Sequence, residues 1–388
     1  MDFHDTPDEA AFRKELRAWI SDNLPDGWRE SAPTSGRMDE PVSREWSKRL
    51  YDAGYAGLTW PKDYGGQDAP YTHQAIFLEE SARAETPEHI GVIGLGMAGP
   101  TIIAHGTDEQ KSAHLSKILS GEEVWCQGFS EPGSGSDLAS LRTRAEDAGD
   151  NYVVNGQKVW SSFAHIADYC ILVVRTDPSA AKHKGITYLL VDMHADGVEV
   201  RPLVQVTGDP EFNEIFFNDV KVPKTNVVGE ANEGWGVAMT TLLHERGTLG
   251  FALTARLEVL VAKLIVLVKE TGAHDDLLIR DRVAQQWIEL QALKFTNYRA
   301  LTTLMRTGVP GPEGSIAKLH WSESNQRLGK LALEILGHRA QLDGDDGVWS
   351  GYWQYQQLRS RGNTIEAGTS EILRNIIAER VLGLPRSR

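Results

Sequence analysis

The chain has 388 residues with 40 basic and 54 acidic side chains, which gives a formal net charge of −14. This length exceeds what one hydrophobic core usually serves, so two or three packed subdomains are expected. The acidic balance argues against a nucleic-acid-binding protein, because neutralising phosphates requires clustered Lys and Arg.

Cysteine content and apolar runs indicate a soluble cytoplasmic protein without a structural metal. Cys126 and Cys170 are the two cysteines, and no Cys-x-x-Cys spacing supports a disulfide framework or a zinc site. The acidic N-terminus lacks the apolar core of a secretory signal. The most apolar helical run, residues 257–268, contains Glu258 and Lys263, so no membrane span is predicted.

The first 120 residues show helical spacing throughout. Phe12, Leu16 and Ile20 recur on one face of a first helix, and Pro25 to Gly27 end it. Further helices are predicted at residues 43–58, 71–85, 90–104 and 108–119, with a Pro- and Gly-containing turn at 60–66.

From residue 124 to 228 the sequence pattern changes from helical spacing to short runs of β-branched residues bounded by Gly, Asp, Asn or Pro. These runs predict strands of a small sheet or barrel at 152–154, 169–174, 186–191, 198–200 and 215–217. Long helices return at 235–271, 276–307, 317–336, 348–359 and 369–382, which favours a bundle. The fold class is therefore α+β, with a helical domain at 1–122, a β-domain at 123–232 and a C-terminal four-helix bundle at 233–388.

Residues 94–99 read G-L-G-M-A-G and match the G-x-G-x-x-G pattern of dinucleotide-binding turns. That motif needs a preceding strand and a βαβ unit, whereas Pro100 follows at once and the neighbouring segments are helical. The pattern is instead interpreted as close helix packing through small residues, or as a roomy pocket wall.

The stretch from Gln127 to Ser162 concentrates turn residues and hydroxyls beside an aromatic tip. It contains the turn S-E-P-G, a small-residue loop ending at Asp137, an alternating strand and Trp160. Small hydroxyls and bare backbone suit the edge of a planar polar ligand, and an aromatic side chain suits its face. The stretch predicts a loop and a hairpin that grip such a ligand.

Five motifs in order resemble the acyl-CoA dehydrogenase family over nearly the whole chain. They are W-P-K-D-Y-G-G at 60–66, S-E-P-G-S-G-S-D at 130–137, N-G-Q-K-V-W at 155–160, D-V-K-V-P at 219–223 and G-T-S-E at 368–371. The resemblance implies that family's fold, bound FAD, and removal of two hydrogens from an acyl-CoA to give a trans-2-enoyl-CoA. It also implies a separate electron acceptor such as an electron-transfer flavoprotein, and a homotetramer or dimer.

By this resemblance the loop from Gln127 to Ser130 lies along the flavin ring, Trp160 covers one face and Ser162 bonds near N5. The full set implied to bind the cofactor is Gln127, Phe129, Ser130, Ser136, Trp160, Ser161, Ser162, Gly337, Gly368, Thr369 and Glu371. The set implied to contact substrate is Ser136, Arg246 and Gly96. The alternative for the serines is ordinary turn chemistry, because Ser favours such loops.

The catalytic base is the least conventional part of this resemblance. Abstracting an α-proton needs a carboxylate within hydrogen-bond reach, yet Ala367 occupies the position where many relatives place Glu. A smaller branch, including isovaleryl- and long-chain acyl-CoA dehydrogenases, carries the base on a central helix just before an Arg. Glu245 before Arg246 matches that pattern and is the candidate base, with Glu366 as its rival.

Ala367 retains one implied role, because its backbone N–H could still bond the thioester carbonyl and stabilise enolate-like charge. Two family signatures that reach a neighbouring flavin are altered: residues 270–274 read E-T-G-A-H, and residues 334–338 read E-I-L-G-H. Arg280, Arg282 or Arg339 could supply the missing charge. The alternatives left open are an FAD-binding subunit of a hetero-oligomer, and a flavin oxidase or monooxygenase on the same scaffold.

Overall fold

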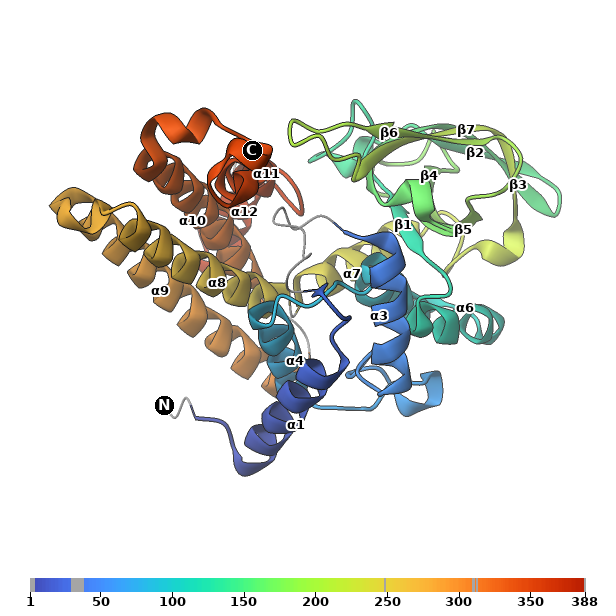
Figure 1. Ribbon diagram of the computed structural model, residues 1–388. Helices are drawn as coiled ribbons and strands as arrows, with labels where there is room; N and C mark the ends of the chain where they lie inside the picture. The colour runs from blue at the N-terminus through green and yellow to red at the C-terminus, as the bar shows by residue number, and fades with distance from the viewer. Residues whose placement is uncertain (1–3, 29–37, 248, 309–310, 312, 387–388) are drawn as a thin grey trace. The chain divides into compact units, whose positions relative to one another are not determined.

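The computed structural model describes residues 4–28, 38–247, 249–308, 311 and 313–386, and it confirms the predicted α+β class (Figure 1). The chain forms two compact units. One comprises Met1–Met38, Ala69–Pro87 and Arg246–Arg388, and the other comprises Asp39–Asp68 and Glu88–Glu245. In the described parts of the chain, no helix combines the length and apolarity needed to cross a membrane.

The first unit is all helical. Its helices are α1 (Pro7–Asn23), α4 (Tyr71–Arg83), α8 (Leu249–Glu270), α9 (Leu277–Thr307), α10 (Glu313–Leu336), α11 (Tyr352–Asn363) and α12 (Ser370–Ile376). α8, α9 and α10 pack against one another, α11 packs on α10, and α4 packs on α8 (Figure 1). The core between them is rich in leucine and includes Leu264, Leu293, Leu328 and the fully buried Trp353. Burial of this apolar surface is what stabilises the bundle.

The second unit joins helices to the sheet. Its helices are α3 (Glu40–Asp52), α5 (Gly99–His105), α6 (Asp108–Ser120) and the part of α7 (Gly234–Gly247) up to Glu245. Its strands are β1 (Trp125–Gly128), β2 (Arg144–Ala148), β3 (Asn151–Ser162), β4 (Tyr169–Arg175), β5 (Ile186–Asp192), β6 (Val198–Leu203) and β7 (Phe212–Pro223). The order across the sheet is β1-β4-β2-β3-β7-β6, and β5 pairs with β4.

The pairing of β3 with β7 is interrupted by two register shifts. At the second shift, between Lys158 and Ser161, β3 contains one more residue than the paired segment of β7. Trp160 lies in this bulge and has a φ of 61°. A bulge of this kind turns a side chain away from its regular direction. Trp160 is consequently 62% exposed, while its neighbours Val159 and Ser161 are buried.

The structure differs from the sequence interpretation in two places. β1 and β2 were not predicted, because β1 is short and almost wholly buried, whereas β2 carries charged residues with four of its five positions exposed. Neither strand shows the alternation that marks a half-buried strand. The single helix predicted at 235–271 is two helices, α7 ending at Gly247 and α8 beginning at Leu249.

The G-x-G-x-x-G pattern lies on a π-helical turn, Gly94–Ala98, that runs directly into α5. A Cβ at Gly99 would lie 2.1 Å from the Trp60 ring, so this glycine permits close packing. A Cβ at Gly96 would meet nothing within 4 Å, so this position is open. The helical context confirms that the pattern is not a dinucleotide-binding turn.

Candidate active site

A buried lysine on β3 fixes the loop that follows β1. Lys158 on β3 is fully buried, and its Nζ donates to the carbonyl of Phe129 (2.9 Å) and to Glu131 Oε1 (2.9 Å). The backbone N–H of Val159 also donates to the Ser130 carbonyl (2.9 Å). Residues 129–131 are therefore fixed to β3 at both ends.

Glu131 completes this arrangement by accepting main-chain hydrogen bonds from the other side. Its carboxylate receives the N–H groups of Arg142 (2.7 Å) and Thr143 (2.8 Å). Burial acts to raise the pKa of Glu131, but the charge of Lys158 and the Thr143 hydrogen bonds hold that pKa below its usual value. Burial lowers the pKa of Lys158, against the attraction of Glu131. The pair is most stable with both members charged, since each satisfies the other.

The residues proposed to face a flavin ring differ in how they are presented. Phe129 and Ser161 are buried, Gln127, Ser130 and Ser162 are half-buried, and Ser136 and Trp160 are exposed. Two buried polar atoms here, Gln127 Nε2 and Ser161 Oγ, have no hydrogen-bond partner within the described structure. Buried polar groups are nearly always bonded, so unpaired ones indicate places where a ligand can bond. These atoms and the outward Trp160 fit an edge and a face of a planar ligand.

In the helical unit, the corresponding feature is the turn between α11 and α12. Ala367 and Gly368 both adopt left-handed backbone conformations, with φ of 50° and 95°. Among the residues that the structure describes, none accepts a hydrogen bond from the Ala367 N–H. This amide is thus available to a carbonyl oxygen of a ligand.

Glu366, the rival base, is bonded within this turn. Its carboxylate accepts from Asn363 Nδ2 (2.7 Å) and from Arg359 Nη1 (3.1 Å). These two donors hold the carboxylate within its own turn.

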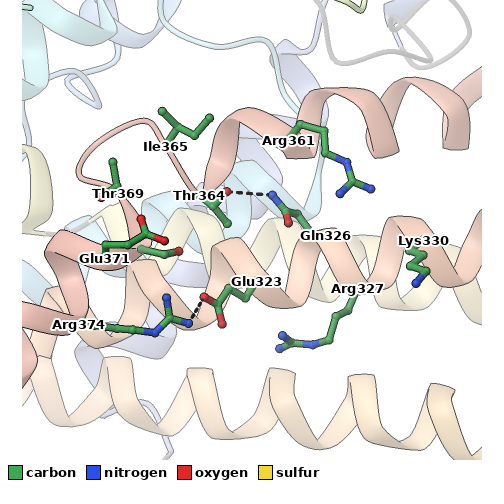
Figure 2. A pocket seen from close by; sticks show the side chains of 11 residues that line it. Glu323, Gln326, Arg327, Lys330, Arg361, Thr364, Ile365, Thr369, Glu371 and Arg374 are labelled. Atoms are coloured by element: carbon green, nitrogen blue, oxygen red, sulfur yellow. Dashed lines mark hydrogen bonds and ion pairs between the residues drawn. The ribbon is translucent and has the colours of Figure 1, made fainter. Parts of the chain in front are cut away.

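Thr369, Ser370 and Glu371 line a pocket of about 480 Å³ on the helical unit. The other lining residues are Glu323, Gln326, Arg327, Lys330, Arg361, Thr364, Ile365 and Arg374 (Figure 2). Four basic and two acidic side chains leave a balance of two positive charges, and Glu323 is itself paired with Arg374. Ser370 Oγ is buried and has no hydrogen-bond partner in the described structure. The pocket suits an anionic group such as a diphosphate.

The remaining predicted site residues are placed as follows. Glu245 and Arg246 have backbones in α7, but their side chains lie outside the described part of the structure. Gly96 is exposed on the π-helical turn, and Gly337 begins a short 3₁₀ turn after α10 with φ of 56°. Gly96 and Glu245 belong to the unit that contains the sheet, and Arg246 and Gly337 belong to the helical unit.

The two altered signatures make contacts inside this chain. Glu334 forms an ion pair with Arg282 across α9 and α10. Glu270 accepts a hydrogen bond from Trp349 Nε1 (3.1 Å) at the end of α8. Of the arginines considered as substitutes, Arg282 is therefore already paired, while Arg280 and Arg339 are exposed.

Family models match nearly the whole chain in three consecutive parts. They are the acyl-CoA dehydrogenase N-terminal domain at residues 6–122, the middle domain at 126–220 and the C-terminal domain at 232–382. The chain belongs to the acyl-CoA dehydrogenase family. It is an oxidoreductase, as the sequence resemblance predicted, and members of this family are typically flavoproteins.

The similar proteins include acyl-CoA dehydrogenases from mycobacteria. Acyl-CoA dehydrogenase IpdE1 of Mycobacterium tuberculosis is 42% identical over 386 residues, covering 98% of each chain. The solved structure of the Tcur3481-Tcur3483 steroid ACAD is 33% identical with a TM-score of 0.89, covering 100% of both chains. A chain in the crystal structure of the ChsE4-ChsE5 complex from Mycobacterium tuberculosis is 34% identical to this chain. The two superpose with a TM-score of 0.87, and the match covers 100% of each.

Sequence reasoning missed two buried lysines that hold loops with predicted site residues. Lys158 holds residues 129–131, and Lys318 on α10 donates to the carbonyls of Asn363 and Gly368 in the turn before α12. Lys158 shares its parity along β3 with the buried Tyr152 and Val154, so alternation could have placed it on the inner face. Lys318 follows Ala317 within a helix, and its only signal was a basic residue among apolar positions. Such a residue is ordinarily interpreted as a solvated charge.

Proposed function

We propose that this acyl-CoA dehydrogenase uses FAD to convert an acyl-CoA thioester to its trans-2-enoyl-CoA and passes the electrons to a separate protein. FAD, when bound, supplies the N5 atom that accepts the β-hydride. The observation that supports this proposal best is the left-handed turn at Ala367, whose N–H has no acceptor among the described residues. That N–H can donate to the thioester carbonyl oxygen and stabilise the negative charge that develops on it.

Glu245 is proposed as the base that removes the α-proton. Its position before Arg246 on α7 follows the branch of the family that carries the base on a central helix. The contacts of the rival support this choice, because the Glu366 carboxylate is bonded to Arg359 and Asn363. A carboxylate held by two donors in its own turn must break those hydrogen bonds before it can come within reach of a substrate α-carbon.

The cofactor-binding residues are proposed in two groups. The loop from Gln127 to Ser130, with Trp160 to Ser162, offers unpaired polar atoms and an outward indole for the flavin ring. The pocket lined by Thr369, Ser370 and Glu371 offers basic side chains for the anionic part of the cofactor (Figure 2). Ser136, which is exposed at the end of its loop, is proposed to contact the substrate.

The base assignment is tested by two matched amide variants, Glu245→Gln and Glu366→Gln. Glu245→Gln is expected to lower the rate of anaerobic flavin bleaching by acyl-CoA by roughly 10²- to 10⁴-fold. Glu366→Gln is expected to stay within about tenfold of wild type. Loss of bleaching in the second variant alone would show that Glu366 is the base. Bleaching in wild type without oxygen separates a dehydrogenase or oxidase from a monooxygenase.

The proposed substrate class is an acyl-CoA that carries a ring system. The support is the likeness to a structure described as a steroid ACAD, at 33% identity over the full chain, together with the open space at Gly96. Branched and dicarboxylic acyl-CoAs are the competing classes. A panel of acyl-CoAs tests the proposal, and a higher kcat/KM for straight-chain thioesters than for ring-bearing ones would overturn it.

A second candidate function is that of one subunit in a hetero-oligomeric acyl-CoA dehydrogenase. Glu334 and Glu270 lie in the two signatures that the family resemblance assigns to a neighbour's flavin, and here they bond Arg282 and Trp349. Two similar structures carry paired names, Tcur3481-Tcur3483 and ChsE4-ChsE5. Expression alone should then give low FAD content that rises with a co-expressed homologue. A homo-oligomer with one FAD per subunit would exclude this candidate.

A further inference from the structure

One buried ammonium group on α10 ties together the turn that carries Ala367. The Nζ atom of Lys318 donates to the carbonyl of Asn363 (2.7 Å) and to the carbonyl of Gly368 (2.8 Å). The residue is only 5% exposed. Asn363 ends α11 and Gly368 directly follows Ala367, so one charged donor fixes both ends of residues 363–368. Hydrogen bonds from a charged donor are roughly twice as strong as neutral ones.

This turn has a backbone that needs such support. Ala367 lies in the left-handed region, which is unfavourable for a residue with a Cβ. Strained conformations of this kind persist only when their surroundings hold them. Asn363 adds a second contact, since its side chain receives Asn325 Nδ2 (2.8 Å) and donates to Glu366 (2.7 Å). The peptide that bears the Ala367 N–H is thereby enclosed between restrained neighbours.

We propose that Lys318 is a positioning residue, which sets the direction of the Ala367 N–H toward the thioester carbonyl. The inference rests on the proposed function, because it assigns that amide to the substrate. An amide donor acts on the developing oxyanion only when it is aimed at where that oxygen will lie. A displacement of about 1 Å in such a group can cost on the order of 10²-fold in rate. The Lys318 ammonium group bonds two carbonyls of the turn, so it is proposed to act through the turn.

A purely structural role for Lys318 makes a different prediction. Loss of its hydrogen bonds would then lower the melting temperature and leave the chemistry of correctly folded enzyme intact. The discriminating quantity is the acidity of a bound thioester. A 3-thia analogue of an acyl-CoA substrate can lose its α-proton when bound, and the bound enolate gives a long-wavelength absorbance with the oxidised flavin. The pH at which half of the bound analogue is ionised reports how well the carbonyl is stabilised.

The experiment compares wild-type holoenzyme with Lys318→Met, together with its partner subunit if co-expression is required. The matched control is Lys269→Met, which removes an exposed lysine at the end of α8. Lys318→Met is expected to lower kcat by about 10- to 100-fold, with KM changed far less, and to raise the pKa of the bound analogue by about 1–2. Lys269→Met is expected to match wild type in both.

Three other results are informative. A bound analogue that ionises equally in Lys318→Met and wild type, at unchanged kcat, would overturn the positioning role. If Lys318→Met does not fold, Lys318→Gln keeps one donor, and its bound analogue should show a smaller rise in pKa in the same direction; no rise would likewise overturn the inference. Failure of the wild-type enzyme to ionise the analogue would instead overturn the proposed function.

Discussion

Two buried lysines, one in each unit, each hold a loop that carries predicted site residues, but their hydrogen-bond acceptors differ in kind. Lys158 in the sheet unit bonds one main-chain carbonyl and the carboxylate of Glu131. Lys318 in the helical unit bonds two main-chain carbonyls. A side-chain acceptor can be removed by substitution, whereas a main-chain carbonyl cannot. The damage from losing Lys158 should therefore be partly reversible by a second mutation, and the damage from losing Lys318 should not.

The two lysines also differ in how far their contacts depend on the side chains of neighbouring residues. In the sheet unit Lys158 acts partly through Glu131, whose carboxylate also accepts hydrogen bonds from the N–H groups of Arg142 and Thr143. In the helical unit the ammonium acts directly on both ends of the turn. Variation at residue 131 is thus coupled to residue 158, whereas the acceptors of Lys318 are main-chain carbonyls, which every residue at 363 and 368 would carry.

The largest expected effect comes from breaking the buried pair. Lys158→Met leaves the Glu131 carboxylate buried without its cation, which should lower the free energy of unfolding by about 3–5 kcal/mol. Urea denaturation followed by circular dichroism measures the change. The double variant Lys158→Met with Glu131→Gln removes both charges and should recover at least half of the loss. A double variant no more stable than Lys158→Met would show that the pair is not coupled in this way.

Acid pH should weaken the sheet unit through His89. This ring is buried, accepts from the Gly91 N–H at Nδ1 (2.9 Å) and bonds the Leu119 carbonyl at Nε2 (3.1 Å), so it is held neutral. Burial lowers the pKa of His89 from 6.5 to about 4. Between these values the unfolded chain binds a proton that the folded chain does not, so stability falls as pH falls through this window. The loss approaches about 3 kcal/mol near pH 4.

His89→Gln removes the titrating group and keeps a polar side chain. The difference in unfolding free energy between pH 7 and pH 4.5 should be about 2–3 kcal/mol smaller in this variant than in wild type. Equal pH dependence in the two proteins would show that His89 titrates normally in the folded state. Following the sheet and helical units by separate probes would show whether the loss is confined to the unit that contains His89.

The sequence predicted the fold class, the order of the elements and the loops of the site, for definable reasons. Long amphipathic helices and turn motifs are local patterns, so α9 and the S-E-P-G turn could be predicted from spacing alone. β1 depends on a neighbour far along the chain, since it pairs with β4. β2 forms a hairpin with the adjacent β3, but its mostly exposed, charged residues do not alternate, so its own sequence does not mark it as a strand. Lys158 and Lys318 act on loops distant in sequence, and only the tertiary structure shows those contacts. The roles of Glu245 and Ala367 stay predictions.

The smallest expected effect on stability is at Trp160, which is exposed, in contrast to the buried Lys158 two residues before it. The Trp160 residue is 62% exposed, and its ring contacts the Phe212 ring edge-on with 6.0 Å between the ring centroids. Trp160→Ala should therefore change the free energy of unfolding of the FAD-free protein by less than about 1 kcal/mol. FAD affinity should fall by roughly 5- to 100-fold, because stacking on an aromatic side chain contributes about 1–3 kcal/mol per base. Titration of the FAD-free protein measures this, and Trp160→Phe should recover much of the affinity. Unchanged FAD affinity in Trp160→Ala would mean that the bulge in β3 presents this indole to something other than the cofactor.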